Sequence, residues 1–163
     1  MTTPWLVGRD GACLEKLSQL HAQSFKEAWR ADAIAGLLDN DGTFALAAGP
    51  SSDPCGFVMA RVVVDEAEIL TIAVAPSWRR GGVGRCLLVA AAWHAAGKGA
   101  LAMFLEVGVE NQAARALYEG LGFRAVGQRK SYYGDGAGRP PQDALTLRAD
   151  LPLRPLGKAL ETD

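Results

Sequence analysis

Apolar and polar positions alternate along the chain with two different periods. Four segments show helical spacing, and seven short runs have the length and composition of strands. In the first helical segment Leu14, Leu17 and Leu20 share one face, and Asp10 stands where an N-cap is expected. The other predicted helices cover residues 30–40, 83–96 and 112–121. The predicted strands cover residues 4–8, 43–49, 55–65, 68–74, 100–107, 123–133 and 143–151.

The order of these elements predicts an α/β fold, in which a mixed sheet has helices on both faces. The runs at 43–49 and 55–65 are separated by the loop "PSSDP", which is typical of a hairpin. Residues 68–74 are apolar at almost every position, as expected of a central strand that is covered on both faces.

Length and composition favour a single domain over residues 1–151, followed by a flexible tail over residues 152–163 that has two prolines and little periodicity. With 163 residues and 49% hydrophobic content, the chain can bury a core without metals or disulfides. No apolar run approaches the roughly 18 to 20 residues that cross a bilayer, and the start "MTTPWLVGRD" lacks the features of a signal peptide. We therefore expect a soluble cytoplasmic protein that has no membrane partner.

Charge and metal-ligating residues argue against two further classes of function. Seventeen basic and eighteen acidic side chains give a formal net charge of -1, whereas direct binding of nucleic acid demands a basic face. The cysteines Cys13, Cys55 and Cys86 are far apart, and neither His21 nor His94 has a partner at metal-ligand spacing. We therefore expect neither a nucleic-acid partner nor a metal site.

The stretch "RRGGVGR", residues 79–85, joins a predicted strand to a predicted helix. It is not a nucleotide P-loop, because Arg85 and Cys86 stand where that motif needs Lys followed by Ser or Thr. It is not the dinucleotide fingerprint either, because Leu87 replaces the third glycine. Glycines at a helix start still let backbone N–H groups converge on an anion such as a pyrophosphate. A tight turn with solvated arginines is the alternative that these seven residues leave open.

Two side chains are candidates for proton transfer. Glu106 interrupts the otherwise apolar strand "MFLEVGV". Burial of a carboxylate raises its pKa toward the range that is useful to a general base. The alternative is a glutamate at a strand end that faces solvent or an arginine. Tyr118 follows Asn111, the expected N-cap of its helix, by seven residues, so both lie on one helix face. Its alternative is a core tyrosine in the apolar stripe of that helix.

Together these residues resemble the GNAT superfamily of acetyl-CoA-dependent N-acetyltransferases. The segment "LTIAVAPSWRRGGVGRCLL" corresponds to the family's strand and [QR]-x-x-G-x-[GA] turn, and "LEVGVENQAARALYEGLGF" corresponds to its later strand, asparagine and helix. The residues "LEV", Asn111, Tyr118 and the late "SYYGDG" are similar to those of bacterial ribosomal-protein alanine N-acetyltransferases and their eukaryotic N-terminal acetyltransferase relatives. The resemblance implies the acyl-CoA N-acyltransferase fold, whose mostly antiparallel central sheet contains one splayed parallel pair.

The resemblance also implies roles for individual residues. Glu106 would be the general base for the substrate ammonium, and Tyr118 the general acid for the departing coenzyme A thiolate. The strand edge at residues 72–74 would pair with the pantetheine arm, and the Val74 N–H would polarise the thioester carbonyl. The residues implied to bind acetyl-CoA are Ile72, Ala73, Val74, Arg79, Arg80, Gly81, Gly82, Val83, Gly84, Arg85 and Asn111. Those implied to bind the substrate are Tyr132 and Tyr133, on a loop that closes over it.

The activity that the resemblance implies is acetyl transfer to the N-terminal α-amine of a protein, the N-terminal alanine of a small-subunit ribosomal protein. One alternative is a small-amine or lysine acetyltransferase on the same scaffold. The other is a non-catalytic acetyl-CoA-binding module, against which the presence of both Glu106 and Tyr118 speaks. Relatives carry "FPW[ST]" between the first two helices, where this chain has "FKEAW", so Phe25 and Trp29 need not fill the same roles. A longer late loop, "AGRPPQD", is a second departure on the side where the substrate would enter.

Overall fold

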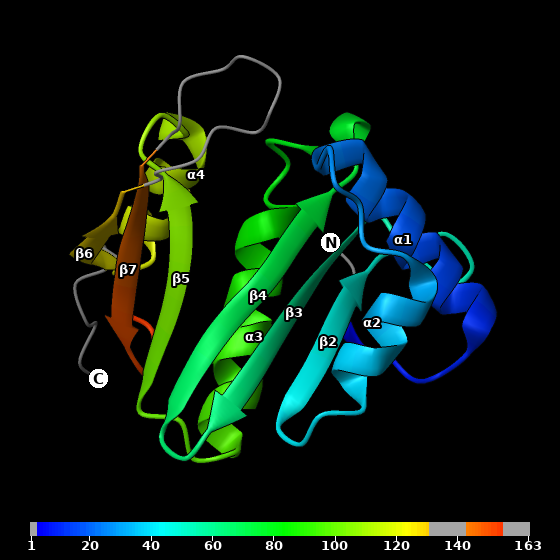
Figure 1. Cartoon of the computed structure of the whole chain (residues 1–163), viewed down its shortest axis with the longest axis horizontal. Helices are drawn as coiled ribbons and strands as arrows, with labels where there is room; N and C mark the ends of the chain where they lie inside the picture. Colours follow the sequence, from blue (N-terminus) through cyan, green and yellow to red (C-terminus); the bar gives the residue numbers. More distant parts are fainter. Residues whose placement is uncertain (1–2, 131–142, 155–163) are drawn as a thin grey trace, which may run out of the picture.

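The computed structural model describes residues 3–130 and 143–154, and its elements follow the order predicted from the sequence (Figure 1). The helices are α1 (Gly11–Ser24), α2 (Ala31–Leu38), α3 (Val83–Gly97) and α4 (Gln112–Gly120), with a short 3-10 turn η1 (Pro76–Trp78) before α3. The strands are β1 (Trp5–Leu6), β2 (Thr43–Ala48), β3 (Gly56–Val63), β4 (Glu66–Val74), β5 (Ala102–Gly108), β6 (Arg124–Arg129) and β7 (Ala144–Asp150).

The seven described strands form one sheet in the order β1-β2-β3-β4-β5-β7-β6. Neighbouring strands are antiparallel except β4 and β5, which run parallel. The predicted hairpin consists of β2 and β3, with Ala48 opposite Gly56 beside the connecting loop. β4 lies at the centre of the sheet, and the predicted mixed α/β architecture is therefore confirmed.

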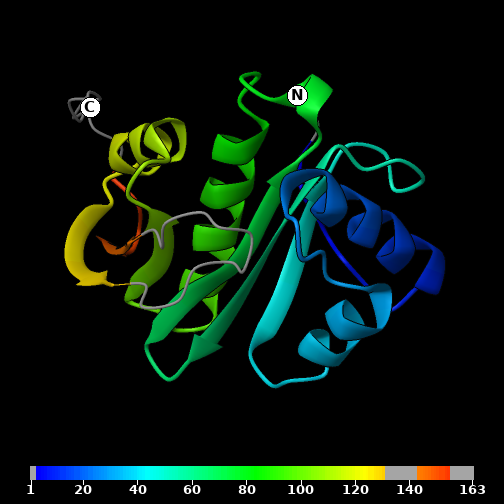
Figure 2. The same ribbon diagram turned by 45° about the horizontal axis from the view of Figure 1, so that its top comes forward.

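Helices cover both faces of the sheet (Figure 2). α1 and α2 pack on one face, where Leu17 and Ile34 are fully buried. α3 and α4 pack on the other face, in a core that includes Leu87, Met103 and Leu121. These two sides are named the α1/α2 face and the α3/α4 face below.

Local sequence explains where two of the helices begin and one ends. The Asp10 side chain accepts a hydrogen bond from Ala12 N at 3.2 Å, and the Asn111 side chain accepts one from Ala114 N at 3.2 Å, as N-caps do. After α4, Gly122 has a φ of 95°. A Cβ at this position would lie 2.8 Å from the carbonyl oxygen of Arg154. The glycine predicted to end the helix is therefore required there by both conformation and space.

The last described residues lie against the body of the domain. Leu151 N donates to Leu101 O at 2.9 Å, and Leu153 packs against the core of the α3/α4 face. The segment predicted to be a tail thus begins with residues in contact with the core, and residues 155–163 lie outside the described part. Among the residues that are described, no helix is both long and apolar enough to span a bilayer.

Candidate active site

The central parallel pair of strands opens into a cleft. Backbone pairing joins Glu66–Glu68 of β4 to Ala102–Phe104 of β5, although β4 continues to Val74 and β5 to Gly108. Beyond the paired part the two strands diverge, as Figure 1 shows. Their separated ends line a cleft of ≈ 690 Å³ that extends from α1 to the starts of α3 and α4. The splayed parallel pair implied by the resemblance is therefore present.

A β-bulge in β4 lies within this cleft. In the pairing with β3, Thr71 is opposite Met59 but Ile69 is opposite Ala60, so Leu70 is an extra residue. The bulge reverses the alternation of side chains, because Ile69 before it and residues 72 and 74 after it all face α3.

The backbone beyond the bulge offers hydrogen-bonding groups to the cleft. Ala75 N donates to Cys55 O at 2.8 Å, so the backbone of Ala75 faces β3. Successive strand residues direct their backbone groups to opposite edges, so Ala73 also faces β3 whereas Ile72 and Val74 face the cleft. β5 does not pair with β4 at this level, so the N–H groups of Ile72 and Val74 are open to a ligand. Of the three strand residues predicted to bind acetyl-CoA, Ala73 directs its backbone away from the cleft.

The predicted anion-binding turn leads directly into α3. Arg80 and Gly82 have positive φ angles of 63° and 86°, and α3 begins at Val83. Cys86 N donates to Gly82 O at 3.0 Å, which is the first hydrogen bond of the helix. The N–H groups of Val83–Arg85 consequently have no partner within the helix, and they lie at the positive end of its dipole. A helix start of this kind binds phosphate groups.

The three arginines of the turn have different surroundings. Arg79 Nε donates to Val74 O at 3.1 Å and Arg79 Nη2 donates to Ser24 Oγ at 3.2 Å. The guanidinium of Arg79 thus ties the end of β4 to the end of α1. Arg80 and Arg85 are exposed and form no ion pair within the described part of the chain. These two arginines are therefore available to bind a phosphate.

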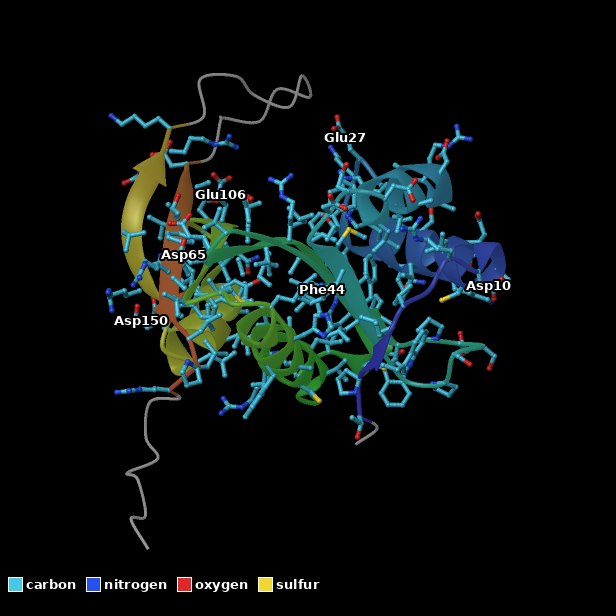
Figure 3. The ribbon with its side chains drawn as sticks, turned by 90° about the horizontal axis from the view of Figure 1, so that it is seen from below. Asp10, Glu27, Phe44, Asp65, Glu106 and Asp150 are labelled. Carbon is cyan, nitrogen blue, oxygen red and sulfur yellow. The ribbon has the colours of Figure 1, made fainter. Side chains whose placement is uncertain are left out.

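Glu106 lies on β5 where the strands have separated, and it lines the cleft. The carboxylate is not buried: 46% of the side chain is exposed, and Oε2 lies 3.4 Å from Arg129 Nη2 of β6. The structure instead shows the alternative arrangement, a glutamate that faces solvent and an arginine. Leu105 and Val107 point into the α3/α4 core, so Glu106 between them points to the α1/α2 face (Figure 3).

Tyr118 reaches the cleft from the opposite face. Its side chain is 7% exposed, its ring centroid lies 6.0 Å from that of Phe123, and it lines the cleft together with Asn111. Tyr118 therefore belongs to the core, as the alternative interpretation has it, and it also borders the cleft. Burial raises the pKa of the Tyr118 hydroxyl above its ordinary value, so the group keeps its proton at neutral pH.

A carboxylate and a phenol thus border one cleft from opposite faces of the sheet. Glu106 can take a proton from a group that enters on the α1/α2 face, and Tyr118 can give one to a group on the α3/α4 face. Between them, the N–H groups of Ile72 and Val74 can stabilise negative charge on a carbonyl oxygen. This arrangement suits the transfer of an acyl group between two substrates that bind from opposite sides.

The segment between α1 and α2 forms the wall of the cleft on the α1/α2 face. His21 of α1 is 2% exposed, and its ring stacks between those of Phe25 and Trp29, with centroid distances of 4.4 and 4.7 Å. Trp29 N donates to His21 Nδ1 at 3.0 Å. Sequence reasoning missed this cluster, although the spacing of one helical turn between His21 and Phe25 was a signal for it. The departure "FKEAW" therefore supplies the two rings that enclose a buried histidine.

Of the remaining predicted site residues, the structure describes the two glycines of the turn but not the two tyrosines. Gly84 lines the cleft, and Gly81 is exposed in the turn. Tyr132 and Tyr133, predicted to bind the substrate, lie outside the described residues. Among residues 3–130 and 143–154, no group of three or more His, Cys, Asp and Glu side chains could hold a metal ion.

The sheet is mixed, and its central pair of parallel strands is splayed. A helix start with free N–H groups lies beside the resulting cleft. Together these features define the class of acyl-CoA-dependent acyltransferase folds. The family comparison agrees with this class. The chain matches the model of the acetyltransferase (GNAT) family over residues 12–123, more than half of its length, and it belongs to that family.

Two curated relatives share the name [ribosomal protein bS18]-alanine N-acetyltransferase. The [ribosomal protein bS18]-alanine N-acetyltransferase of Escherichia coli strain K12 is 41% identical over 97 residues, which are 60% of this chain and 64% of that protein. The chain thus spans just under two thirds of the length of this relative. A putative [ribosomal protein bS18]-alanine N-acetyltransferase of Bacillus subtilis is 30% identical over 135 residues, covering 82% of this chain and 87% of the relative.

Solved structures share the fold over almost the whole chain. The crystal structure of the ribosomal-protein-S18-alanine N-acetyltransferase from Escherichia coli superposes with a TM-score of 0.80 at 26% identity, covering 98% of this chain and 99% of that one. Arabidopsis thaliana NAA60 in complex with acetyl-CoA has a TM-score of 0.76 at 20% identity, covering 91% and 99% of the two chains. Because its identity is only 20%, the likeness to NAA60 shows a shared fold alone.

Proposed function

We propose that this chain is an acetyl-CoA-dependent N-acetyltransferase that modifies the N-terminal α-amine of a protein. The observation that carries the proposal is the position of Glu106 and Tyr118 on opposite faces of one cleft. The names of the relatives favour the N-terminal alanine of ribosomal protein bS18 as the acceptor. Because ribosomal proteins are made in the cytoplasm, the reaction is expected to take place there.

The residues of the cleft fit acetyl-CoA. The N–H groups of Val83–Arg85 would hold the pyrophosphate. Arg80 and the Arg85 side chain would add charge-assisted hydrogen bonds. The Ile72 and Val74 N–H groups would bind carbonyl oxygens of the pantetheine arm and the thioester. The Oδ1 atom of Asn111 accepts from Ala114 N, and the two hydrogens of Nδ2 would be available for a contact with the coenzyme.

The acceptor has to enter from the α1/α2 face, because the pyrophosphate site and Tyr118 occupy the α3/α4 face. On the α1/α2 side it meets Glu106 of β5 and, across the cleft, the segment 25–29. Phe25 is 42% exposed and offers apolar surface, and Glu27 adds a second carboxylate on this side of the sheet (Figure 3). Two carboxylates favour a cationic acceptor such as an N-terminal ammonium.

Arg129 contacts the proposed base before the acceptor binds. Its Nη2 lies 3.4 Å from Glu106 Oε2, and 74% of the Arg129 side chain is exposed. Exposed ion pairs contribute only about 0.2–1 kcal/mol, so an incoming ammonium can replace the guanidinium at little cost.

In the proposed reaction Glu106 takes a proton from the acceptor ammonium, directly or through water, and the amine attacks the thioester carbonyl carbon. The Val74 N–H stabilises the negative charge that develops on the carbonyl oxygen. A C–N bond forms, the C–S bond breaks, and Tyr118 protonates the leaving thiolate. The ammonium loses two protons in all. One restores the tyrosine hydroxyl, and the other passes through Glu106 to solvent.

Release of free thiol with three acceptors tests the proposal. The acceptors are a peptide that begins with alanine, the same peptide blocked at its N-terminus but containing a lysine, and a polyamine. Turnover with the first acceptor alone is the expected result, and it should depend on the first two or three residues of the peptide. Turnover with the blocked peptide or the polyamine would instead identify a lysine or small-amine enzyme.

The Glu106→Gln protein is the matched control for this assay, because it alters one oxygen and removes the proposed base. It should bind coenzyme A like the wild type while releasing thiol slowly. Binding of coenzyme A by the wild type without thiol release for any acceptor would leave only the non-catalytic binding module.

A further inference from the structure

Two side chains of α1 hold the backbone of Trp29, which lies in the wall of the cleft. Trp29 N donates to His21 Nδ1 at 3.0 Å, and Ser18 Oγ donates to Trp29 O at 2.8 Å. Ser18 and His21 are three residues apart, so they lie on the same side of the helix. Both polar groups of the Trp29 backbone are therefore satisfied by α1.

Ring packing adds to this clamp. Phe25 and Trp29 stack on His21 with interplanar angles of 24° and 17°. Phe57 of β3 lies against the same imidazole, with a centroid distance of 6.4 Å. One imidazole thus supplies both the acceptor for a backbone N–H and the centre of the stack that holds the segment 25–29.

We propose that His21 is a positioning residue for the acceptor, which holds the segment 25–29 against the cleft and releases it when Nδ1 takes up a proton. The inference rests on the proposed function, because the acceptor binds against this segment. Only a neutral imidazole has a lone pair on Nδ1 to accept the Trp29 N–H. An imidazolium carries hydrogen on both ring nitrogens, so two N–H groups would oppose each other and the contact would be lost.

The surroundings of His21 favour its neutral form. Burial lowers the pKa of His21 from its ordinary value of 6.5. β3 presents Phe57 to it, which does not titrate. The charged side chains of the adjoining segment are Lys26, Glu27 and Arg30, and those that line the cleft together with His21 are Glu27, Arg79 and Glu106. The pKa of His21 is lower in the folded state than in the unfolded chain, where it is about 6.5. The clamp is therefore complete above about pH 6.5 and is lost as the pH falls through the folded-state pKa.

Two substitutions of His21 separate its acceptor atom from its ring. His21→Phe keeps an aromatic ring but has no acceptor, so the KM for the acceptor peptide should rise about 5- to 30-fold, while the KM for acetyl-CoA stays unchanged. His21→Asn keeps an acceptor oxygen that cannot be protonated. Its KM for the peptide at neutral pH should rise less than that of His21→Phe. In the wild type the KM for the peptide should also rise as the pH falls below about 6.5, and in His21→Asn this pH-dependent rise should be absent. His94→Phe is the matched control, because His94 also packs on an aromatic ring but lies outside the cleft: its centroid is 4.3 Å from that of Phe44, and the two rings are tilted by 50°.

An NMR titration of the wild type tests the clamp without reference to activity. The His21 ring should be the Nε2–H tautomer at neutral pH, and the Trp29 amide signal should move together with protonation of that ring. The proposal would be overturned if the Trp29 amide signal did not follow the protonation of the His21 ring. It would also be overturned if His21→Phe changed the KM for the peptide and the KM for acetyl-CoA no more than His94→Phe does. If the wild type acetylates none of the acceptors, the proposed function fails, but the NMR titration still decides whether the clamp exists.

Discussion

Replacement of Tyr118 by phenylalanine removes the proposed general acid and leaves its packing in place. The ring is 7% exposed and contacts Phe123 with a centroid distance of 6.0 Å, and Tyr118→Phe retains all of these ring atoms. Loss of one hydroxyl should change the free energy of unfolding by about 1 kcal/mol or less, which is about 2–4 °C in Tm for a chain of this size.

The effect on rate should be far larger than the effect on stability. A positioned general acid contributes about 10²–10⁴-fold to the rate, or about 2.7–5.4 kcal/mol of activation free energy. Burial raises the pKa of Tyr118, so the wild-type hydroxyl is protonated throughout the neutral range. The ratio of wild-type to variant kcat should therefore stay constant between about pH 6 and 8.

Single-turnover release of thiol measures this step, and calorimetry with coenzyme A checks that binding is unchanged. A second acetyl thioester, whose thiol is more acidic than that of coenzyme A, needs less help from an acid, so the defect of Tyr118→Phe should shrink with it. An unchanged kcat with acetyl-CoA, or an equal defect with both thioesters, would refute the assignment of Tyr118 as the acid.

Three further changes test other parts of the site. Glu106→Gln should lower kcat about 10²–10⁴-fold without changing the affinity for coenzyme A, and a wild-type rate would rule out Glu106 as the base. Gly82→Ala places a Cβ at a φ of 86°, so Tm should fall by about 2–8 °C, and calorimetry should show a larger loss of affinity for coenzyme A than for pantetheine, which lacks the pyrophosphate. Equal losses for both ligands would contradict the anion site. Asn111→Ala removes a cap worth about 1 kcal/mol, so Tm should fall by about 2–4 °C, whereas Asn111→Asp should retain the wild-type value.

Much of the fold and part of the site could be predicted from the sequence by itself. The caps at Asp10 and Asn111 and the glycine at position 122 depend on residues within a few positions, so local pattern is enough to place them. The predicted anion site also rests on local sequence, because the start of α3 after Gly82 leaves the N–H groups of its first residues without helical partners. Family membership follows from the same short motifs.

Only the tertiary structure decided which side chains meet in the cleft. Glu106 borders the cleft because β4 and β5 part before it, and it pairs with Arg129 because β6 brings that arginine close; the apolar pattern of its strand shows neither. Arg79 belongs to the turn by sequence, but it binds Ser24, which is 55 residues away. The enclosure of His21 likewise depends on Trp29 folding back over α1. These contacts are set by the order of the strands, the bulge in β4 and the return of the chain, which local periodicity does not encode.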